Sequence, residues 1–319
     1  SRGLGDVYKR QECNPWSVFQ MRKQGATRVE IGVQCLDDGV HDKLNRQQKV
    51  KDVIKATKLL KEAGFKVVYH MMPGLPGMTP ETDLRDFKRL FEEEDFQPDM
   101  LKLYPTLLVK GSPLARNPGD FVPYDTETAA NVVADLKEIV PPYVRIQRIQ
   151  RDIPKPQIIA GVMNSNLRQY ARKEMKRRGK KCQCINCREL WRAQIDPETA
   201  ELKEIEYKSS GGTEYFISYE SGTKLLAYVR LRLDENATVR ELKVTGQAAN
   251  IGKTSTGVQH MGLGSKLMKI AEDKAAKDYD KIRVTHGAGT RIYYEKLGYF
   301  LEDYYMVKDL EKKNDKNKN

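Results

Sequence analysis

Two stretches of this 319-residue chain, Gln259-His260-Met261-Gly262-Leu263-Gly264 and Tyr293-Tyr294-Glu295-Lys296-Leu297-Gly298-Tyr299, decide how its C-terminal part folds. The first stretch predicts a glycine turn that opens a helix, because apolar residues follow at helical spacing over residues 263–274. Glycine lets the backbone come close to a bulky anion, and the free N–H groups at a helix start favour negative charge. The second stretch predicts a helix that carries two tyrosines and ends at Gly298.

The order of turn, helix, strand over residues 281–285 and tyrosine-bearing helix resembles the acetyl-CoA site of the GNAT family of N-acetyltransferases. In that family a Q/R-x-x-G-x-G/A turn holds the coenzyme pyrophosphate through backbone amides. A tyrosine just before E-K-L-G-Y/F commonly lies near the coenzyme sulfur as a general acid. The resemblance implies a catalytic Tyr294 with Tyr293 beside it, although both could simply pack the helix against a sheet. The residues implied to bind acetyl-CoA are Gln259, His260, Met261, Gly262, Leu263, Gly264 and Tyr294.

Composition narrows the class of protein. Lys and Arg number 56 against 44 Asp and Glu, a formal net charge of +12, which suggests a polyanionic partner. The length suits two domains. The sequence has no apolar run of the roughly 18 residues that a membrane span needs, and its start does not look like a signal peptide. Five cysteines, an odd number with three close together, do not form a secreted disulfide framework. We therefore expect a cytoplasmic protein with no membrane partner.

The N-terminal half alternates between strand and helix patterns. Strands are expected over residues 29–34, 66–72, 100–104 and 143–149, with helices over 50–63, from Pro80 and from about Asp125. Such alternation predicts parallel βα units, in an open sheet or a barrel. After residue 195 the pattern changes to short strands over 214–219, 224–232 and 239–244. The expected divisions are a leader of doubtful origin (1–11), a βα domain (12–165), a basic linker (166–195), an acetyltransferase domain (196–310) and a charged tail (311–319).

The linker contains three cysteines within six residues, Cys182, Cys184 and Cys187. Thiolates this close together form a good cage for a soft tetrahedral ion such as zinc. A fourth ligand would come from Cys13, Cys35 or a histidine. The alternative is three unligated thiols in a loop. The position between two domains favours a structural zinc over a catalytic one.

A dense basic run precedes these cysteines. Between Arg168 and Lys181 eight residues are basic and one, Glu174, is acidic. Upstream, Arg145, Arg148 and Arg151 add positive charge near the end of the βα domain. A phosphate backbone is the natural partner of such a run, and the alternative is a solvated charged helix. The candidate nucleic-acid-binding residues are Arg148, Arg151, Arg168, Arg172, Lys173, Lys176, Arg177 and Arg178.

Several segments taken in order resemble one family, the catalytic subunits of Elongator, of the archaeal and bacterial single-subunit type. They are N-P-W, V-E-I-G-V-Q, H-M-M-P-G-L-P-G, L-K-L-Y-P-T, I-Q-R-I-Q-R-D-I-P, N-L-R-Q and C-Q-C-I-N-C-R-E, followed by the acetyltransferase motifs. The resemblance spans roughly residues 14 to 310. It implies a radical S-adenosylmethionine (SAM) barrel, present in part, followed by a GNAT domain, with a zinc-binding linker between them.

The resemblance implies a tRNA wobble-uridine acetyltransferase. In that family acetyl-CoA is converted to a methylene radical that adds to carbon 5 of the base, and hydrolysis leaves a carboxymethyl group. The implied partner is the anticodon region of tRNA, bound by the basic residues named above, and a homodimer or accessory subunits are possible partners. The implied cofactors are acetyl-CoA, zinc and, in the full-length protein, SAM with a [4Fe–4S] cluster.

One feature departs from the family. The chain contains no C-x3-C-x2-C, the motif whose cysteines hold the cluster, so it looks like an N-terminally truncated member. Two alternative functions stay open. The chain could acetylate proteins or small amines, for which Glu241 or His286 is a possible base. It could also be a noncatalytic tRNA-binding module.

Overall fold

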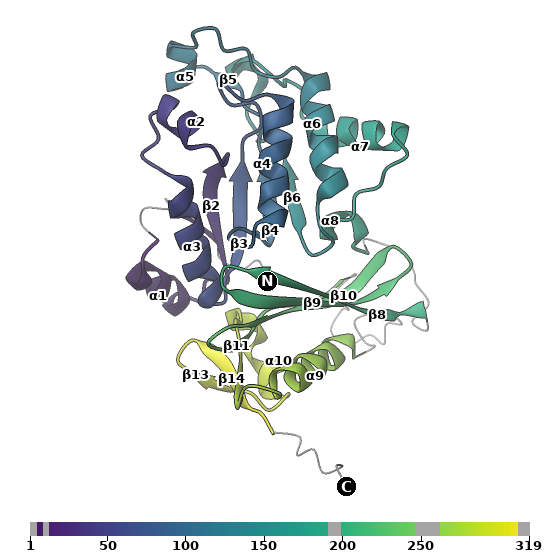
Figure 1. The fold of residues 1–319 in the computed structure, drawn as a ribbon. Coiled ribbons are helices and arrows are strands. Elements are labelled where there is room, and N and C mark those ends of the chain that lie inside the picture. Colours follow the sequence, from purple (N-terminus) through teal and green to yellow (C-terminus); the bar gives the residue numbers. More distant parts are fainter. Residues whose placement is uncertain (1–4, 9–12, 191–198, 246–261, 312–319) are drawn as a thin grey trace.

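The computed structural model describes residues 5–8, 13–190, 199–245 and 262–311, and its two main sheets lie one above the other, the lower one running across beneath the amino ends of the upper strands (Figure 1). The upper sheet has five parallel strands in the order β1-β2-β3-β4-β6. Its strands are β1 (Gly5–Tyr8), β2 (Arg28–Gln34), β3 (Lys66–Met71), β4 (Met100–Leu103) and β6 (Arg145–Ile149). The predicted parallel βα architecture is therefore confirmed, as part of a barrel wall.

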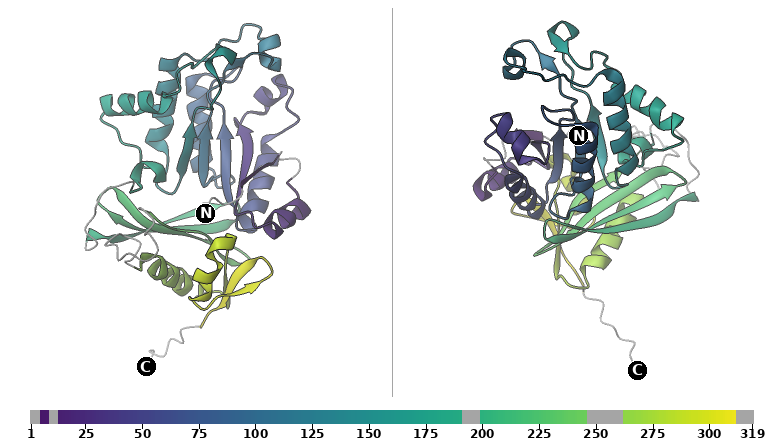
Figure 2. Two further views of the ribbon diagram at one scale, coloured as in Figure 1. Left: turned by 180° about the vertical axis from the view of Figure 1, so that it is seen from behind. Right: turned by 45° about the horizontal axis from the view of Figure 1, so that its top comes forward.

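Helices cover one face of this sheet, and the view from behind shows the strands on the other face (Figure 2). The covering helices are α3 (Val50–Glu62), α4 (Pro80–Glu92) and α6 (Thr126–Ile139), and α1 (Pro15–Lys23) and α2 (Asp38–Lys43) lie to one side. Two helix starts follow the sequence signals, since Thr79 caps α4 ahead of Pro80 and Asp125 caps α6. Side chains of α3, α4 and α6 pack with the strands in one hydrophobic core.

Two carboxylates on α4 hold the loops that leave the upper sheet. The Leu36 N–H donates to Asp86 at 2.7 Å, after β2. The Gly74 N–H and the Tyr124 hydroxyl both donate to Asp83 at 2.8 Å, after β3. Burial raises the pKa of Asp83 to about 7 despite these donors. Two carboxylates of α4 therefore hold the loops that follow β2 and β3.

The lower sheet has seven strands in the order β13-β14-β12-β11-β10-β9-β8. They are β8 (Glu201–Ser209), β9 (Gly212–Ser221), β10 (Lys224–Leu233), β11 (Ala237–Val244), β12 (Lys281–Val284), β13 (Phe300–Glu302) and β14 (Tyr305–Asp309). Helices α9 (Leu263–Ala275) and α10 (Arg291–Glu295) complete this half. Only β11 and β12 run parallel among these described strands, and they pair over just three residues. Their pairing ends at Val239 and Val284, where β12 itself ends, whereas β11 continues to Val244, and this leaves a gap beside β11 among the described strands.

The linker joins the two halves through α7 (Leu167–Arg177) and α8 (Ile185–Arg188). Two short elements, β5 (Leu108–Val109) and β7 (Ile158–Ala160), pair at the far end of the upper sheet, next to α5 (Pro113–Arg116) and the 3-10 turn η2 (Lys155–Gln157). A second 3-10 turn, η5 (Ala288–Thr290), leads into α10. No helix in the described part of the chain has the length and apolar composition needed to cross a membrane.

A buried ion network fastens the lower sheet to the amino ends of the upper strands. Arg240, in β11, is fully buried and binds both oxygens of Asp99 at 2.6 and 2.8 Å. The same guanidinium donates to Glu214 at 2.9 Å and to the Phe65 carbonyl at 2.6 Å. Asp99 and Phe65 lie just before β4 and β3, so one side chain ties two strands of the upper sheet to two strands of the lower sheet.

Further charges extend this network. Lys61, at the end of α3, donates to the Gln97 carbonyl at 2.7 Å and lies 3.8 Å from Glu214. Arg230 contacts the Tyr143 carbonyl and Asp99, and Arg232 contacts Glu214 and the Ser209 carbonyl. Burial alone would raise the pKa of Asp99, but the cations Arg240, Lys61 and Arg230 hold it well below its ordinary value. Asp99 is therefore ionised in the folded protein.

Replacing Asp99 by Asn tests the network, since it leaves the buried Arg240 without its full charge partner. We expect a loss of roughly 3–5 kcal/mol in the free energy of unfolding, measured by urea denaturation at neutral pH. The contribution of Asp99 is complete above its unfolded pKa and is lost as the pH falls, so the difference between parent and variant should shrink in acid. Lys58→Gln, which breaks the exposed Lys58–Glu62 pair, is the control and should cost less than about 0.5 kcal/mol. Equal costs for the two variants would contradict the role of the network.

Candidate functional site

The start of α9 has the geometry of an anion site. Gly262 is its N-cap and adopts φ +66° and ψ 14°, a left-handed conformation that favours glycine. No described side chain caps this end, so its first N–H groups stay available. A Cβ at Gly262 would meet no described atom within 4 Å, so the described residues leave the space in front of the turn open. Of the predicted turn, Gln259, His260 and Met261 lie outside the described residues, and Gly262, Leu263 and Gly264 lie within them.

Gly264 and Tyr293 fit against each other. A Cβ at Gly264 would lie 2.9 Å from the Tyr293 hydroxyl oxygen, so only glycine leaves room for this ring at the first turn of α9. Tyr293 itself is 37% exposed. We expected Gly264 to make room for a ligand, and in the structure it also makes room for the packing of α10 on α9.

Tyr294 points inward instead. It is 5% exposed and packs edge-on against Tyr293 and Tyr299, with ring centroids 5.2 and 5.9 Å away. Burial raises the pKa of Tyr294, so its phenol stays protonated and can donate a hydrogen bond. The two tyrosines therefore differ in setting, and their catalytic roles stay predictions.

A cavity of about 680 Å³, here called the interdomain chamber, lies where β11 and β12 separate. Its walls come from both halves of the molecule and from the linker. The upper sheet contributes the beginnings of its strands, the linker contributes α8, and the lower half contributes β11, the loop after β12 and α10. The lining residues are Thr27, Arg28, Lys66, Met100, Arg145, Gln147, Asn186, Glu241, Leu242, Lys243, Thr285, His286, Gly287, Thr290 and Tyr294.

Both bases considered from sequence face this chamber together with Tyr294. Glu241 accepts from Arg230 Nε at 3.0 Å, and although burial opposes its charge, Lys66 and Arg230 lower its pKa. Burial lowers the pKa of His286, whose Nδ1 lies 3.3 Å from the Gly287 carbonyl oxygen. At neutral pH the carboxylate is ionised and the imidazole is neutral, so either can accept a proton.

Glu189 clamps two cations of the chamber wall. Its carboxylate accepts both guanidinium branches of Arg145, one of them at 2.8 Å, and lies 2.7 Å from Lys243 Nζ. Arg145 belongs to β6 and Lys243 to β11, so one linker side chain joins the two halves at the chamber. From sequence, Arg145 was grouped with the basic residues, and Glu189 was missed, although it stands two residues after Cys187 in the C-Q-C-I-N-C-R-E segment.

The three linker cysteines converge as predicted. Their sulfurs all lie within 4.8 Å of one another, and in the described part of the chain Cys13, Cys35 and the histidines stay outside the group. The buried ammonium of Lys137 lies 3.5 Å from Cys187 Sγ. Hydrogen bonds from the neighbouring thiols lower the pKa of Cys187 to about 2 and raise the pKa of Cys182, so Cys187 is the thiolate of the group. A buried cation beside converging sulfurs suits thiolates, which are the form that binds zinc. The donor set therefore fits a structural zinc ion with three protein ligands from this group.

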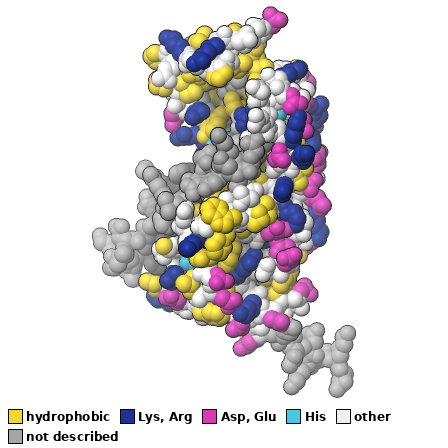
Figure 3. Space-filling view, turned by 90° about the vertical axis from the view of Figure 1, so that its left-hand side faces the viewer, with side chains coloured by type: hydrophobic (Ala, Val, Ile, Leu, Met, Phe, Trp, Pro, Cys, Tyr) yellow, Lys and Arg dark blue, Asp and Glu magenta, His cyan; other side chains and the backbone are white. Residues whose placement is uncertain are grey.

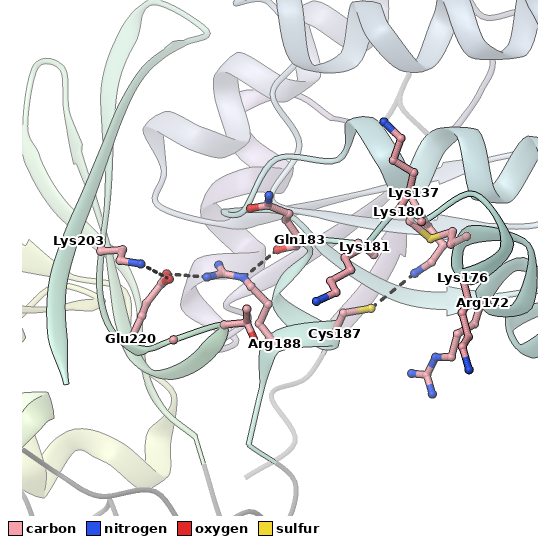
Figure 4. A pocket seen from close by; sticks show the side chains of 15 residues that line it. Lys137, Arg172, Lys176, Lys180, Lys181, Gln183, Cys187, Arg188, Lys203 and Glu220 are labelled. Atoms are coloured by element: carbon pink, nitrogen blue, oxygen red, sulfur yellow. Dashed lines mark hydrogen bonds and ion pairs between the residues drawn. The ribbon is translucent and has the colours of Figure 1, made fainter. Parts of the chain in front are cut away.

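A second cavity of about 570 Å³, here called the basic pocket, adjoins the cysteines (Figure 4). Seven lysines and arginines line this pocket, whereas only one described carboxylate, that of Glu220, does so. Glu220 already pairs with Arg188 and Lys203. Four side chains keep an unpaired charge within the described residues, namely Arg172, Lys176, Lys180 and Lys181. By contrast, the face in Figure 3 mixes acidic, basic and hydrophobic side chains.

The other predicted basic residues lie outside this pocket. Arg168 donates to the Ile146 and Gln147 carbonyls at 3.3 Å, and Arg177 binds Glu174 at 2.6 Å. Arg178 binds Glu174, Asp135 and Glu138, so its charge is engaged inside the protein. Lys173 is exposed on α7. Arg148 is exposed near the carboxyl end of β6 and pairs with Asp152 at 2.9 Å, and Arg151 is exposed just after this strand. The candidate set thus divides into a pocket-lining group and residues elsewhere.

Comparison with known proteins assigns the family. The Radical SAM superfamily model matches residues 12–90, and the Radical_SAM C-terminal domain model matches residues 98–177. The chain is 41% identical to the tRNA uridine(34) acetyltransferase of Dehalococcoides mccartyi, over 94% of this chain and 70% of that protein. The chain belongs to the Elp3-type tRNA uridine(34) acetyltransferase family. Its fold is accordingly a radical SAM domain followed by a GNAT-like acetyltransferase fold.

Other members of the Elp3-type family agree. The tRNA uridine(34) acetyltransferase of Methanocaldococcus jannaschii is 43% identical over 94% of this chain, and the chain spans 60% of its length. The solved structure of Methanocaldococcus infernus Elp3 with an N-terminal deletion superposes with a TM-score of 0.91, at 41% identity, covering 97% of this chain and 78% of that one. The superfamily match from residue 12 puts part of a radical SAM domain in this chain, and the expected absence of its cluster-binding part stays an expectation.

The zinc prediction can be tested directly. Metal analysis of the purified protein should give about one zinc per chain, and replacing Cys182, Cys184 and Cys187 together by serine should remove it, because serine does not supply a thiolate. The matched control is Cys35→Ser, a buried cysteine outside the group. Zinc that persists in the triple variant would rule the site out.

Proposed function

We propose that this chain carries the acetyl-CoA site and a tRNA-binding surface of an enzyme that modifies carbon 5 of the tRNA wobble uridine. The observation that carries the proposal is the interdomain chamber. There Tyr294 of the acetyltransferase half and the beginnings of the radical SAM strands line one cavity. An acyl donor from one half can therefore meet chemistry from the other without leaving the protein.

In this proposal the coenzyme pyrophosphate binds at the free N–H groups of α9, in front of Gly262. The pantetheine arm then enters the gap between β11 and β12. The acetyl group reaches the chamber, where Tyr294 donates a hydrogen bond to the sulfur as the carbon–sulfur bond breaks. The pKa of Tyr294 is raised by burial, so the phenol is a hydrogen-bond donor at neutral pH.

The cationic wall of the chamber suits this step. Arg28, Arg145 and Lys243 face the cavity, and positive charge stabilises negative charge that develops on the thioester oxygen. Glu189 holds Arg145 and Lys243 in place, so these side chains do not have to reorganise during the reaction. Glu241 and His286 can take up a proton there.

The basic pocket is the proposed contact for the tRNA backbone. Its four unpaired cations among the described residues, Arg172, Lys176, Lys180 and Lys181, match the charge of adjacent phosphates. The pocket and the chamber share the linker, because Cys187 and Arg188 line the pocket and Asn186 lines the chamber. In the proposal, tRNA bound at the linker stimulates the breakdown of acetyl-CoA.

SAM and a [4Fe–4S] cluster would supply radical chemistry in a family member that binds them. The five cysteines of this chain contain no C-x3-C-x2-C, and the three that converge lie in the linker. The residues present therefore do not fit the cluster, and the proposal contains no step that depends on it.

A second candidate function is acetyl transfer to an amine. The observation that favours it is the presence of Glu241 and His286 in the same cavity as Tyr294, because an amine acceptor needs a base. The two functions differ in whether acetyl-CoA breakdown needs tRNA.

Tyr294→Phe tests the acetyl-CoA proposal. The variant keeps the ring and its packing, so acetyl-CoA affinity by calorimetry should change little, but tRNA-stimulated release of coenzyme A should fall by about 10²–10⁴-fold. Tyr293→Phe is the control and should have a smaller effect. A Tyr294→Phe protein that releases coenzyme A at the parent rate would remove this residue from the mechanism. Release by the parent without tRNA would favour amine acetylation.

Charge reversal tests the tRNA surface. Arg172→Glu together with Lys176→Glu should weaken tRNA binding, because each ion pair with a phosphate releases counterions. The slope of log affinity against log salt should fall by about 0.7–0.9 for each phosphate that is no longer neutralised. Reversal of Arg177, which already binds Glu174, is the control and should do less. Unchanged affinity and slope in the double variant would mean that the basic pocket is only a solvated surface.

A further inference from the structure

One amine of the interdomain chamber, that of Lys66, has no partner among the described residues. Lys66 begins β3, is partly buried and lines the cavity. Within the described residues its Nζ makes no hydrogen bond or ion pair, whereas Lys243 in the same wall is 2.7 Å from Glu189. Burial lowers the pKa of Lys66, although Glu241 and Asp99 oppose this, so the neutral amine is easier to reach than for a surface lysine.

The backbone before Lys66 is fixed at the point where β11 and β12 separate. The Phe65 carbonyl accepts from Arg240, the residue that bulges from β11 between Val239 and Glu241. A Cβ at Gly64, with φ +77°, would lie 2.2 Å from Thr285 Oγ1, so this turn rests directly on the end of β12. These two contacts hold the backbone next to Lys66, and Lys66 lies at the opening of the gap between β11 and β12.

The acyl donor proposed above would deliver its thioester carbonyl to this same opening, and the inference rests on that proposed function. An amine acceptor of an acetyltransferase has to approach the thioester from outside the strand gap. Here the radical SAM half covers that side, and the chain itself places an amine there.

We propose that Lys66 is an acetyl acceptor, so that the chain acetylates its own chamber. The Lys66 amine attacks the thioester carbonyl carbon, a carbon–nitrogen bond forms and the carbon–sulfur bond breaks. The electron pair leaves on sulfur, where Tyr294 hydrogen-bonds the thiolate, and the proton lost by nitrogen passes to the Glu241 carboxylate. The products are N-acetyl-lysine and coenzyme A, and no oxidant or reductant is needed.

This modification changes the chamber. Acetylation removes one cation and places an acetyl group in the cavity. Acetylated Lys66 would mark protein in which acetyl-CoA reached the chamber while no tRNA was bound to receive its acetyl group.

The test is a time course of lysine acetylation by peptide mass spectrometry, with purified protein and acetyl-CoA in the absence of tRNA. Lys66 should be acetylated at least about tenfold faster than Lys269, whose side chain is 67% exposed and pairs with Asp273, and than Lys243, which pairs with Glu189. Desulfo-coenzyme A, which occupies the coenzyme site without reacting, should slow Lys66 and leave Lys269 unchanged. Tyr294→Phe should slow Lys66 by about tenfold or more.

Acetylation of Lys66 no faster than that of Lys269, or unaffected by desulfo-coenzyme A, overturns the inference. Calorimetry with acetyl-CoA then separates the two failures. A protein that binds acetyl-CoA but leaves Lys66 unmodified keeps the proposed function, and a protein that does not bind it loses both. Lys66→Arg keeps the charge and should remove the modified peptide with the fold intact by circular dichroism.

Discussion

The arrangement of this molecule depends on the buried guanidinium of Arg240. It binds Asp99 and the Phe65 carbonyl on the radical SAM side and Glu214 on the acetyltransferase side. Three more cations surround it, namely Lys61, Arg230 and Arg232. Two further carboxylates take part, since Glu241 pairs with Arg230 and Asp234 pairs with Arg232. Four cations therefore face four carboxylates within the described residues. A protein in which apolar side chains replace such a network is often equally stable. Its value here is directional, because Arg240 keeps its bonds to Asp99, Glu214 and the Phe65 carbonyl in only one relative orientation of the two halves.

The chamber exists because of that orientation. Two further contacts fix the same docking, since Arg283 donates to the Glu62 carbonyl at 2.7 Å and Tyr305 donates to the Ala63 carbonyl at 3.0 Å. Together they press the Gly64 turn onto the gap between β11 and β12. The beginnings of the radical SAM strands face this gap and form one wall of the chamber. The fixed charges of the chamber wall act more strongly beside protein atoms than they would in open water.

A few residues of the linker connect the cysteine cluster, the basic pocket and the wall of the chamber. Cys182, Cys184 and Cys187 converge, Arg188 joins Pro142 to Glu220, and Glu189 joins Arg145 to Lys243. A metal ion at the cysteines would therefore fix both the basic pocket and the chamber wall. The cluster is also tied to the upper half, because Cys184 is buried in its hydrophobic core and Cys182 and Cys187 pack against that core.

Much of the fold could be predicted from the sequence, because local signals and tertiary structure agree. Thr79 with Pro80, and Asp125, mark helix starts that depend only on nearby backbone. Strand β8 was missed because charged residues stand on both of its faces, as an edge strand allows. The cysteine cluster was predictable from spacing, and Tyr294 from its motif. Lys66, Glu189 and Arg145 were not assigned to the chamber, because their roles come from contacts between residues more than 40 positions apart, which no local pattern encodes.

The most direct test of the account is a crystal structure of this chain with acetonyl-coenzyme A, in which the thioester cannot be cleaved. The account predicts the pyrophosphate at the first turn of α9, in front of Gly262, the pantetheine between β11 and β12, and the carbonyl group in the interdomain chamber beside Tyr294. A carbonyl group that lies on the outer face of the acetyltransferase half, away from the radical SAM strands, would contradict it.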